Sequence, residues 1–239
     1  MGGTDEDPSR ILRHLLGRVC RVVPQWWRGR LVSARQRVLP AKRSGGRSEA
    51  EAARDASKEN SCRGPKMRLL SLFDGTGSLS KPFQEAGWEV QSLDIDGRHG
   101  ATLVCDILTW DFSDEPYPDV LWAACPCESY SCANTRGKRN LALADSLVAK
   151  TWEIITHFLR ANPSMLWFVE NPDSSMLWRR TVGKCLTPML RLDFCQYGAL
   201  YRKRTRLATN SGFVPRALCD PKTCHACREI GRASCRERV

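Results

Sequence analysis

The chain has 239 residues, which is enough for one full domain with tails but cramped for two. Hydrophobic residues make up 42 % and charged residues 26 %, and no apolar run approaches the roughly 18 residues of a membrane span, so a soluble, non-membrane protein is expected. The net charge of +11 is uneven: residues 1–66 hold 15 Lys and Arg against 7 Asp and Glu, residues 67–200 hold 12 against 16, and residues 201–239 hold 10 against 3. The two basic ends would either attract a polyanion such as a nucleic acid or remain solvated tails.

The twelve cysteines could suggest a secreted disulfide scaffold, but the N-terminus lacks the layout of a signal peptide. We therefore interpret them as reduced thiols of a protein in the nucleus or cytoplasm. At most a few of them should take part in chemistry.

Residues 1–66 are expected to form a basic, largely disordered extension, because they show no strand-like alternation and residues 41–66 are rich in Ser, Gly, Arg and Lys. Within them, "DPSRILRHLLGRVCRVV" has the spacing of a basic amphipathic helix. Organelle targeting by this helix is an alternative, which the acidic start "TDED" disfavours.

From Met67 onward the pattern predicts strands that alternate with helices. Apolar runs of strand length occur at 67–73, 88–94, 101–107, 118–125 and 165–171, a short helix is expected at 80–87, and 144–160 carries an apolar stripe at helical spacing. This alternation predicts an α/β domain with a doubly wound, mostly parallel sheet. Ligands of such sheets bind at the carboxyl ends of the strands.

Three predicted strand ends carry residues suited to a nucleoside ligand. Gly75 and Gly77 follow the first strand in "FDGTGS" and would let the backbone turn sharply and approach a ligand. Asp94 ends the second strand 20 residues after Asp74, the spacing at which an acid accepts hydrogen bonds from ribose hydroxyls. Asp106, at the end of the third strand, could meet an adenine amino group.

The fourth marked strand end is "CPCESYS", residues 125–131. One intervening proline gives Cys125 and Cys127 a spacing too tight for a zinc clip. Cys125 still belongs to the strand and is expected to be buried as a small apolar residue. Cys127 follows Pro126 in the loop, where a reactive thiol would face the ligand of the glycine loop.

The motifs "LFDGTGS", "SLDID", "CDI", "PCESYS", "VENP" and "RKRTRLATN" occur in the order and at roughly the spacing of the DNA (cytosine-5)-methyltransferases. The chain resembles the short, phage-like members most, over about residues 67–228. The resemblance implies a Rossmann-like S-adenosylmethionine-dependent methyltransferase fold, DNA as partner and a monomer.

The resemblance also implies a mechanism, in which a thiolate adds to carbon 6 of cytosine so that carbon 5 can take the methyl group of S-adenosylmethionine. Cys127 would be the thiolate, and Glu170 would hold or protonate ring nitrogen 3 and the exocyclic amine. Arg206, and less directly Arg204, would contact the base oxygen and a phosphate. In a base-flipping enzyme, residues 128–143 could close over DNA with Arg136, Lys138 and Arg139 facing phosphates. The cofactor-binding set comprises Phe73, Asp74, Gly75, Gly77, Asp94, Asp106, Ile107 and Pro126.

Three residues depart from the family pattern: Glu128 and Arg202 each replace a usual glutamine, and Pro172 replaces a usual valine. Glu128 beside the nucleophile should raise the pKa of the thiol. These departures leave two alternatives open: methylation of tRNA by the same chemistry, or a catalytically inactive homologue that binds nucleic acid or cofactor. An amino-directed methyltransferase is disfavoured, because those enzymes use an Asp/Asn-Pro-Pro-aromatic loop.

The end of the sequence contains a cysteine pattern that could bind a metal, followed by a segment that does not look like part of a gene. No metal is expected in the reaction, but Cys219, Cys224 and Cys227 have a C-x4-C-x2-C spacing that would bind zinc if a fourth ligand followed. Residues 229–239, "EIGRASCRERV", look like a translated sequencing adapter. We therefore interpret the chain as a C-terminally truncated copy whose catalytic domain, 67–228, is incomplete.

Overall fold

A computed structural model of the chain describes residues 66–224, with the exception of 133, 135–136 and 200. The predicted N-terminal extension, except its last residue, and the predicted adapter segment lie outside the described residues. No helix in the described part of the chain combines the length and apolar character needed to cross a membrane.

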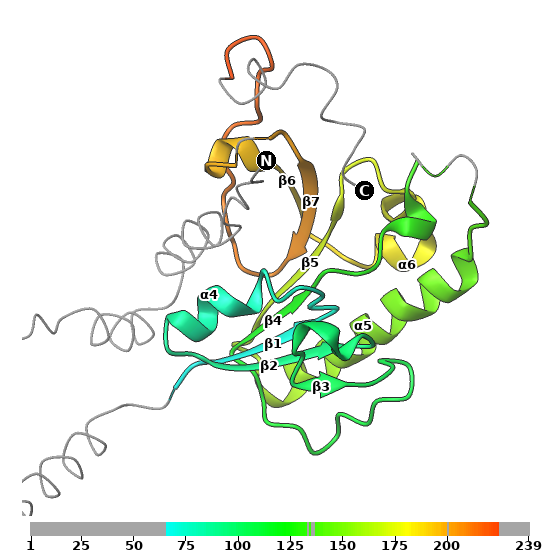
Figure 1. Ribbon diagram of the computed structural model, residues 1–239, viewed down its shortest axis with the longest axis vertical. Helices are drawn as coiled ribbons and strands as arrows, with labels where there is room; N and C mark the ends of the chain where they lie inside the picture. Colours follow the sequence, from blue (N-terminus) through cyan, green and yellow to red (C-terminus); the bar gives the residue numbers. More distant parts are fainter. Residues whose placement is uncertain (1–65, 133, 135–136, 200, 225–239) are drawn as a thin grey trace, which may run out of the picture.

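The described residues form a seven-stranded sheet in the order β3-β2-β1-β4-β5-β7-β6 (Figure 1). Strands β1 to β5 run parallel to one another, whereas β7 runs antiparallel to both β5 and β6. This mostly parallel sheet with helices on both sides confirms the predicted Rossmann-like α/β class. The strands are β1 (Arg68–Leu72), β2 (Glu89–Asp94), β3 (Leu103–Val104), β4 (Val120–Ala123), β5 (Leu166–Pro172), β6 (Met189–Asp193) and β7 (Arg204–Thr209).

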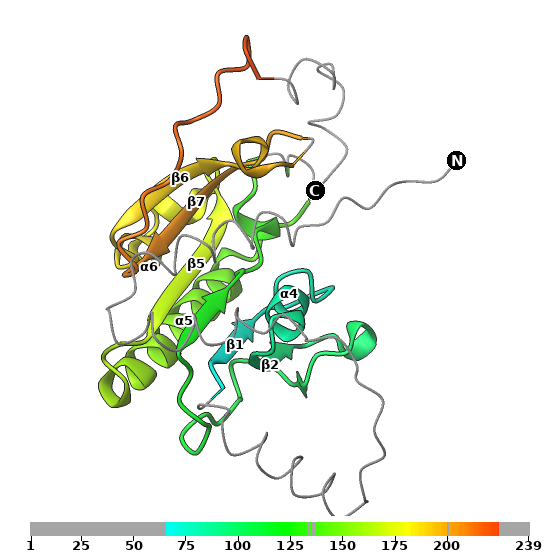
Figure 2. The ribbon, with the colours of Figure 1, turned by 90° about the vertical axis from the view of Figure 1, so that its left-hand side faces the viewer.

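Helices α4 and α5 lie on opposite sides of this sheet (Figure 2). The helices are α4 (Ser80–Glu85), α5 (Leu141–Ala161) and α6 (Thr181–Lys184), with short 3-10 turns η1 (Gly97–His99), η2 (Glu128–Tyr130), η3 (Met176–Arg179) and η4 (Phe194–Tyr197).

Successive side chains of the central strands point to opposite faces of the sheet and pack into two separate hydrophobic cores. Leu70, Leu72 and Leu121 pack on the α5 side, whereas Leu69 and Val120 pack with Phe83 on the α4 side. Because the inner strands are covered on both faces, their sequences are nearly continuous apolar runs. The connections at the carboxyl ends of the strands therefore carry the polar chemistry.

The longest helix, α5, starts three residues before its predicted position. The side chain of Asn140 accepts a hydrogen bond from the backbone N–H of Leu143 at 3.0 Å and caps the helix. The predicted apolar stripe is confirmed in its centre, where Thr151, Ile154, Ile155 and Phe158 are buried. The strand expected at 101–107 shortens to Leu103–Val104, because side chains accept the backbone N–H groups on both sides of it: the Ser92 hydroxyl accepts that of Thr102, and the Asp106 carboxylate accepts that of Leu108.

Candidate active site

The glycine loop follows β1, and three of its residues, two of them glycines, have positive φ angles. Phe73, Gly75 and Gly77 have φ of 58°, 54° and 71°. A Cβ added at Gly75 would meet no atom within 4 Å, so the space beside this part of the loop is open. Gly77 is buried, and its N–H donates to the carbonyl of Asp74 at 3.0 Å, which closes the turn into α4.

Asp74 holds this loop in shape and faces inward. Its carboxylate accepts hydrogen bonds from the hydroxyls of Ser71 at 2.7 Å and Ser80 at 2.6 Å. Both serines are buried, so Asp74 joins β1 to the first turn of α4. Asp74, predicted as a cofactor ligand, therefore has an evident structural role in the loop.

Asp94 lies beside the glycine loop, at the end of β2. Its Oδ2 accepts the N–H of Gly75 at 2.8 Å and its Oδ1 accepts the N–H of Asp96 at 2.9 Å. Each carboxylate oxygen has a second lone pair that a ribose hydroxyl could use. The next residue, Ile95, is 73 % exposed and offers apolar surface beside this carboxylate. Ile95 was not among the predicted residues, although its position in "SLDID" could have indicated it.

Asp106 follows β3 at the same edge of the sheet. Its Oδ1 accepts the N–H of Leu108 at 2.9 Å, while the N–H of Cys105 donates to the carbonyl of Asp94 at 3.1 Å. The ends of β2 and β3 are thus tied together. Ile107, in contrast, is a core side chain that is 3 % exposed, so its side chain is not available to a ligand.

The two cysteines of "CPC" lie in different environments, as predicted. Cys125 is buried, its Sγ lies 3.7 Å from the hydroxyl of Thr151, and burial raises its pKa to about 12. Its carbonyl accepts the side-chain N–H of Asn171 at 2.7 Å, which anchors the loop to β5. Pro126 is exposed and Cys127 is half-buried, so the second thiol is the accessible one.

A buried tyrosine positions the loop that follows Cys127. The N–H of Tyr130 donates to the carbonyl of Cys127 at 3.0 Å, and its hydroxyl donates to Asp145 of α5 at 2.8 Å. Asp145 also pairs with Arg180, whose guanidinium holds the pKa of this carboxyl below its usual range. Sequence reasoning missed this Tyr130–Asp145–Arg180 group, because its members are up to 50 residues apart in the chain.

Glu170 and Lys203 form the charged surroundings of Cys127. The Lys203 ammonium lies 3.4 Å from Oε1 of Glu170, and this oxygen also accepts the hydroxyl of buried Thr205 at 3.1 Å. Burial and the charge of Glu170 raise the pKa of Cys127, whereas the charge of Lys203 lowers it. Glu128 is exposed and also raises that pKa, which is the predicted direction, but it contributes less than burial or Glu170. A protonated thiol therefore lies beside a carboxylate and an ammonium group.

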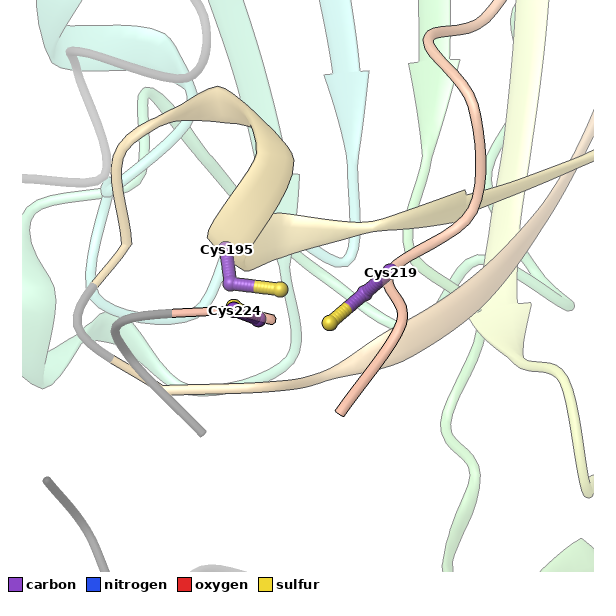
Figure 3. A group of neighbouring side chains, drawn as sticks. All are labelled: Cys195, Cys219 and Cys224. Carbon is purple, nitrogen blue, oxygen red and sulfur yellow. The ribbon is translucent and has the colours of Figure 1, made fainter. Parts of the chain in front are cut away.

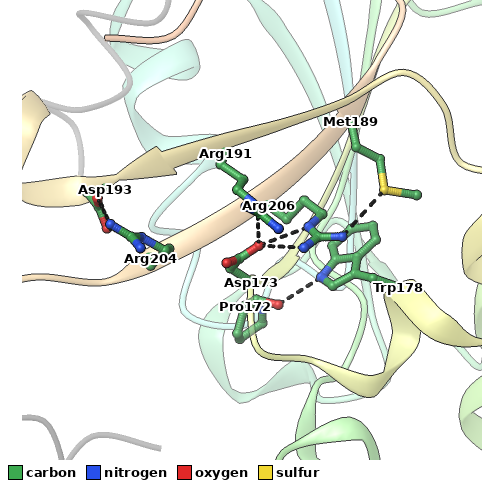
Figure 4. Close-up of polar contacts among 8 residues, drawn as sticks. All are labelled: Pro172, Asp173, Trp178, Met189, Arg191, Asp193, Arg204 and Arg206. Atoms are coloured by element: carbon green, nitrogen blue, oxygen red, sulfur yellow. Dashed lines mark hydrogen bonds and ion pairs between the residues drawn. The ribbon is translucent and has the colours of Figure 1, made fainter. Parts of the chain in front are cut away.

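The two predicted arginines form ion pairs, Arg206 with Asp173 and Arg204 with Asp193 (Figure 4). Arg206 is opposite Asn171 in the register and Leu207 is opposite Glu170, so Arg206 and Glu170 project to different sides of the sheet. The guanidinium of Arg206 donates twice to one oxygen of Asp173, at 2.9 and 2.7 Å, and lies over the ring of Trp178. The structure thus does not bring Arg206 together with the candidate nucleophile.

Arg204 is likewise engaged in an ion pair. It donates to both oxygens of the buried Asp193 at 3.0 and 2.8 Å, and Arg202 lies 3.6 Å from the same carboxylate. Arg202, one of the departures from the family pattern, therefore supports the β6–β7 hairpin. Pro172, another departure, accepts the indole N–H of Trp178 through its carbonyl at 2.8 Å.

Lys203 and Thr205 were not among the predicted site residues, although the alternation of side chains along the strand could have indicated them. Residues of a strand alternate between its faces, so in "RKRTR" the lysine and threonine share one side and the three arginines the other. The family motif drew attention to the arginines. The antiparallel register with β5 decides which set faces Glu170.

Of the loop cations expected to face phosphates, only two belong to the described residues. Lys138 is exposed, whereas Arg139 donates to the carbonyl of Asn134 at 2.7 Å and to the sulfur of Met176 at 2.9 Å. Arg136 lies outside the described residues.

Neither family models nor curated proteins match the chain. Among solved structures, DesVI of Streptomyces venezuelae has a TM-score of 0.30 at 17 % identity, over 50 % of this chain and 49 % of its own length. An amino pentose methyltransferase of Micromonospora echinaspora with bound S-adenosylmethionine has a TM-score of 0.29 at 20 % identity, over 55 % and 58 %. The glycopeptide N-methyltransferase MtfA has a TM-score of 0.39 at 16 % identity, over 78 % and 97 %. The chain spans about half the length of the first two, and similarities of this size assign neither fold nor function.

Proposed function

We propose that the chain is an S-adenosylmethionine-dependent methyltransferase that acts on carbon 5 of cytosine in DNA through a covalent adduct with Cys127. The observation that carries this proposal is the convergence of Cys127, Glu170 and Lys203 at the carboxyl edge of the sheet that also holds the glycine loop. A thiol can act as the nucleophile that adds to a pyrimidine ring, a carboxyl group can exchange a proton with the ring, and a nearby cation favours the thiolate.

The residues at the glycine loop fit the cofactor. Open space at Gly75 admits a ligand close to the backbone, Asp94 has lone pairs for ribose hydroxyls, and exposed Ile95 would pack on a flat heterocycle. When bound there, S-adenosylmethionine supplies an electrophilic methyl group.

The chemistry assigned to this chain begins at Cys127. Its thiol loses a proton to solvent, and the thiolate sulfur forms a bond to carbon 6 of the cytosine while the electron pair of the carbon 5–carbon 6 double bond moves toward carbon 5 and ring nitrogen 3. Glu170 would hold the exocyclic amine and ring nitrogen 3, and proton sharing with that nitrogen disperses the negative charge that the addition creates. After carbon 5 has accepted the methyl group, it loses its proton to solvent, the sulfur–carbon bond breaks, and the thiolate is released.

Lys203 takes the cation role that the family resemblance gives to the arginines. Its ammonium group is placed against Glu170 and favours the thiolate form of Cys127, whereas Arg206 would have to leave Asp173 to reach a base. Arg206 is therefore a positioning residue for the chain between β5 and η3 in this proposal.

Methyl transfer by the full chain to duplex DNA and to tRNA, with product bases identified by mass spectrometry, tests the proposal. Wild type and Cys132→Ser should form 5-methylcytosine in DNA, and Cys127→Ser should form none, because a hydroxyl is a far poorer nucleophile than a thiolate. Cys132 lies in the same loop and is exposed, which makes it a matched control.

Other results would select the alternatives. Methylation of tRNA alone would replace the DNA substrate. Cofactor binding without transfer to either polymer would identify a non-catalytic homologue. Carbon-5 methylation by Cys127→Ser would overturn the mechanism.

A further inference from the structure

Three thiols meet at the edge of the sheet, away from the candidate nucleophile. The sulfur atoms of Cys195, Cys219 and Cys224 all lie within 4.8 Å of one another (Figure 3). Cys195 belongs to η4, and the other two follow β7, so the sequence spacing that indicated Cys219 and Cys224 did not reveal Cys195. Cys227, the third cysteine of that spacing, lies outside the described residues.

Hydrogen bonds of the backbone hold both segments in place. The N–H of Cys219 donates to the buried carboxylate of Asp193 at 2.8 Å, and the N–H of Arg216 donates to the hydroxyl of Tyr197 in η4 at 2.8 Å. The converging geometry is therefore built into the scaffold.

The turn between the second and third thiols is also well formed. The N–H of Cys224 donates to the carbonyl of Asp220 at 3.0 Å, and the N–H of Lys222 donates to its carboxylate at 2.9 Å. This turn brings Cys224 back over Cys219 and Cys195.

Three sulfur atoms at this separation match the requirement of a thiolate-rich zinc site. With Zn–S bonds of about 2.3 Å, tetrahedral geometry places its sulfur ligands about 3.8 Å apart. A disulfide could join only two of the three and would leave the third beside it. We propose that Cys195, Cys219 and Cys224 bind a structural zinc ion as three of its four ligands.

The surroundings of the thiols agree with this chemistry. Cys219 is buried and the other two are half-buried, so an ion held by the three sulfur atoms would be partly shielded from water. Zinc is bound by thiolates, so its binding would displace the protons of the thiols.

The site would connect the end of the described chain to the active site. Asp193, which accepts the N–H of Cys219, also pairs with Arg204, and Lys203 is the preceding residue. A zinc ion at this position would fix the segment between β6 and β7 and thereby the ammonium group near Cys127. None of the three thiols has a role in the reaction proposed above, so zinc binding can be tested separately from methyl transfer.

Zinc content and cobalt spectra of the reduced full chain test the proposal. Wild type should carry stoichiometric zinc after dialysis, and its cobalt form should show thiolate-to-metal charge transfer. Cys195→Ser should lose both signals, whereas Cys185→Ser, which changes an exposed thiol, should keep them. Cys195→His should retain zinc, because imidazole can replace a thiolate ligand.

Removal of zinc by a chelator should lower the melting temperature of wild type and leave Cys195→Ser unchanged. The proposal fails if folded wild type binds no zinc under reducing conditions, or if Cys195→Ser binds it as wild type does. A disulfide between any two of the three residues in the reduced, metal-supplemented protein would also contradict it. If Cys195→Ser does not fold, the cobalt spectrum of wild type decides: the absence of thiolate charge transfer rejects the site.

Discussion

The carboxylates that follow the ends of β1, β2 and β3 and those beside β7 have different kinds of partner. In the β1–β3 half, Asp74, Asp94 and Asp106 accept hydrogen bonds from hydroxyls and backbone N–H groups. In the β5–β7 half, the three acidic partners all pair with cations of the β7 segment: Glu170 with Lys203, Asp173 with Arg206 and Asp193 with Arg204.

This difference separates two tasks. Neutral donors shape a loop and leave lone pairs for an uncharged polyol such as ribose. Ion pairs fix the positions of charges, and one of those charges acts on a thiol. Substitutions of the carboxylates in the first half should therefore change the affinity for the cofactor. In the second half, substitutions on the Lys203 face of β7 should change the rate of methyl transfer, and substitutions on the Arg206 face should change stability.

The largest effect on stability is expected for Asp193→Ala. The substitution removes the partner of Arg204 and Arg202 and the acceptor of the Cys219 N–H, so the free energy of unfolding should fall by about 3 kcal/mol. Urea denaturation measures it. Arg98→Ala, which breaks the exposed pair with Asp96, is the control and should cause no measurable loss. Equal effects would show that the β7 pairs do not hold this half together.

In the first half, Asp94→Ala should weaken binding of S-adenosylmethionine by about 1–3 kcal/mol, because a charged acceptor of hydrogen bonds is lost. Calorimetric titration measures the affinity, and Asp111→Ala supplies a control at an exposed carboxylate outside the glycine loop. Unchanged binding by Asp94→Ala would remove Asp94 from the cofactor site.

The two faces of β7 can be compared directly with Lys203→Met and Arg206→Met. Lys203→Met should lower kcat for methyl transfer by roughly tenfold, equivalent to about 1.4 kcal/mol, with little change in melting temperature. Arg206→Met should lower the melting temperature, because Asp173 loses its shortest ion pair, and should affect kcat less. If Arg206→Met lowered kcat and Lys203→Met lowered the melting temperature, the catalytic role would belong to Arg206 and not to Lys203.

A smaller effect concerns the pH dependence of Cys127. Burial and Glu170 raise its pKa, so alkylation of Cys127 by iodoacetamide should increase with pH above the range of an ordinary thiol. Glu170→Gln removes a nearby negative charge, stabilises the thiolate and should shift this profile to lower pH. A shift to higher pH would show that Glu170 does not act on the thiol.

The first half of the sheet was predictable because its contacts are local or follow one parallel crossover. Glycines after a strand and an acid about 20 residues later sufficed to place Gly75 beside Asp94, which the hydrogen bond between them confirms. The different burial of Cys125 and Cys127 was also predicted, but not for the right reason: β4 ends at Ala123, so Cys125 is buried in the loop and does not belong to the strand as predicted.

The second half was less predictable, because it depends on an antiparallel register between segments some 35 residues apart. That register places Thr205 and Lys203, rather than Arg206, on the side of Glu170. The thiol cluster depends on the same hairpin, since Cys195 meets Cys219 only after β6 and β7 have paired. Motif spacing contains no information on either juxtaposition.

The most direct test of the central claim, that Cys127 forms a covalent bond to cytosine, is to trap the adduct. Full-length chain is incubated with S-adenosylmethionine and duplex DNA that contains 5-fluorocytosine, whose fluorine cannot leave carbon 5 as a proton does. The account predicts a denaturant-stable complex with DNA whose cross-linked peptide contains Cys127, and no complex with Cys127→Ser. A cross-link at another cysteine, or 5-methylcytosine formed on ordinary DNA without any trapped complex, would contradict it.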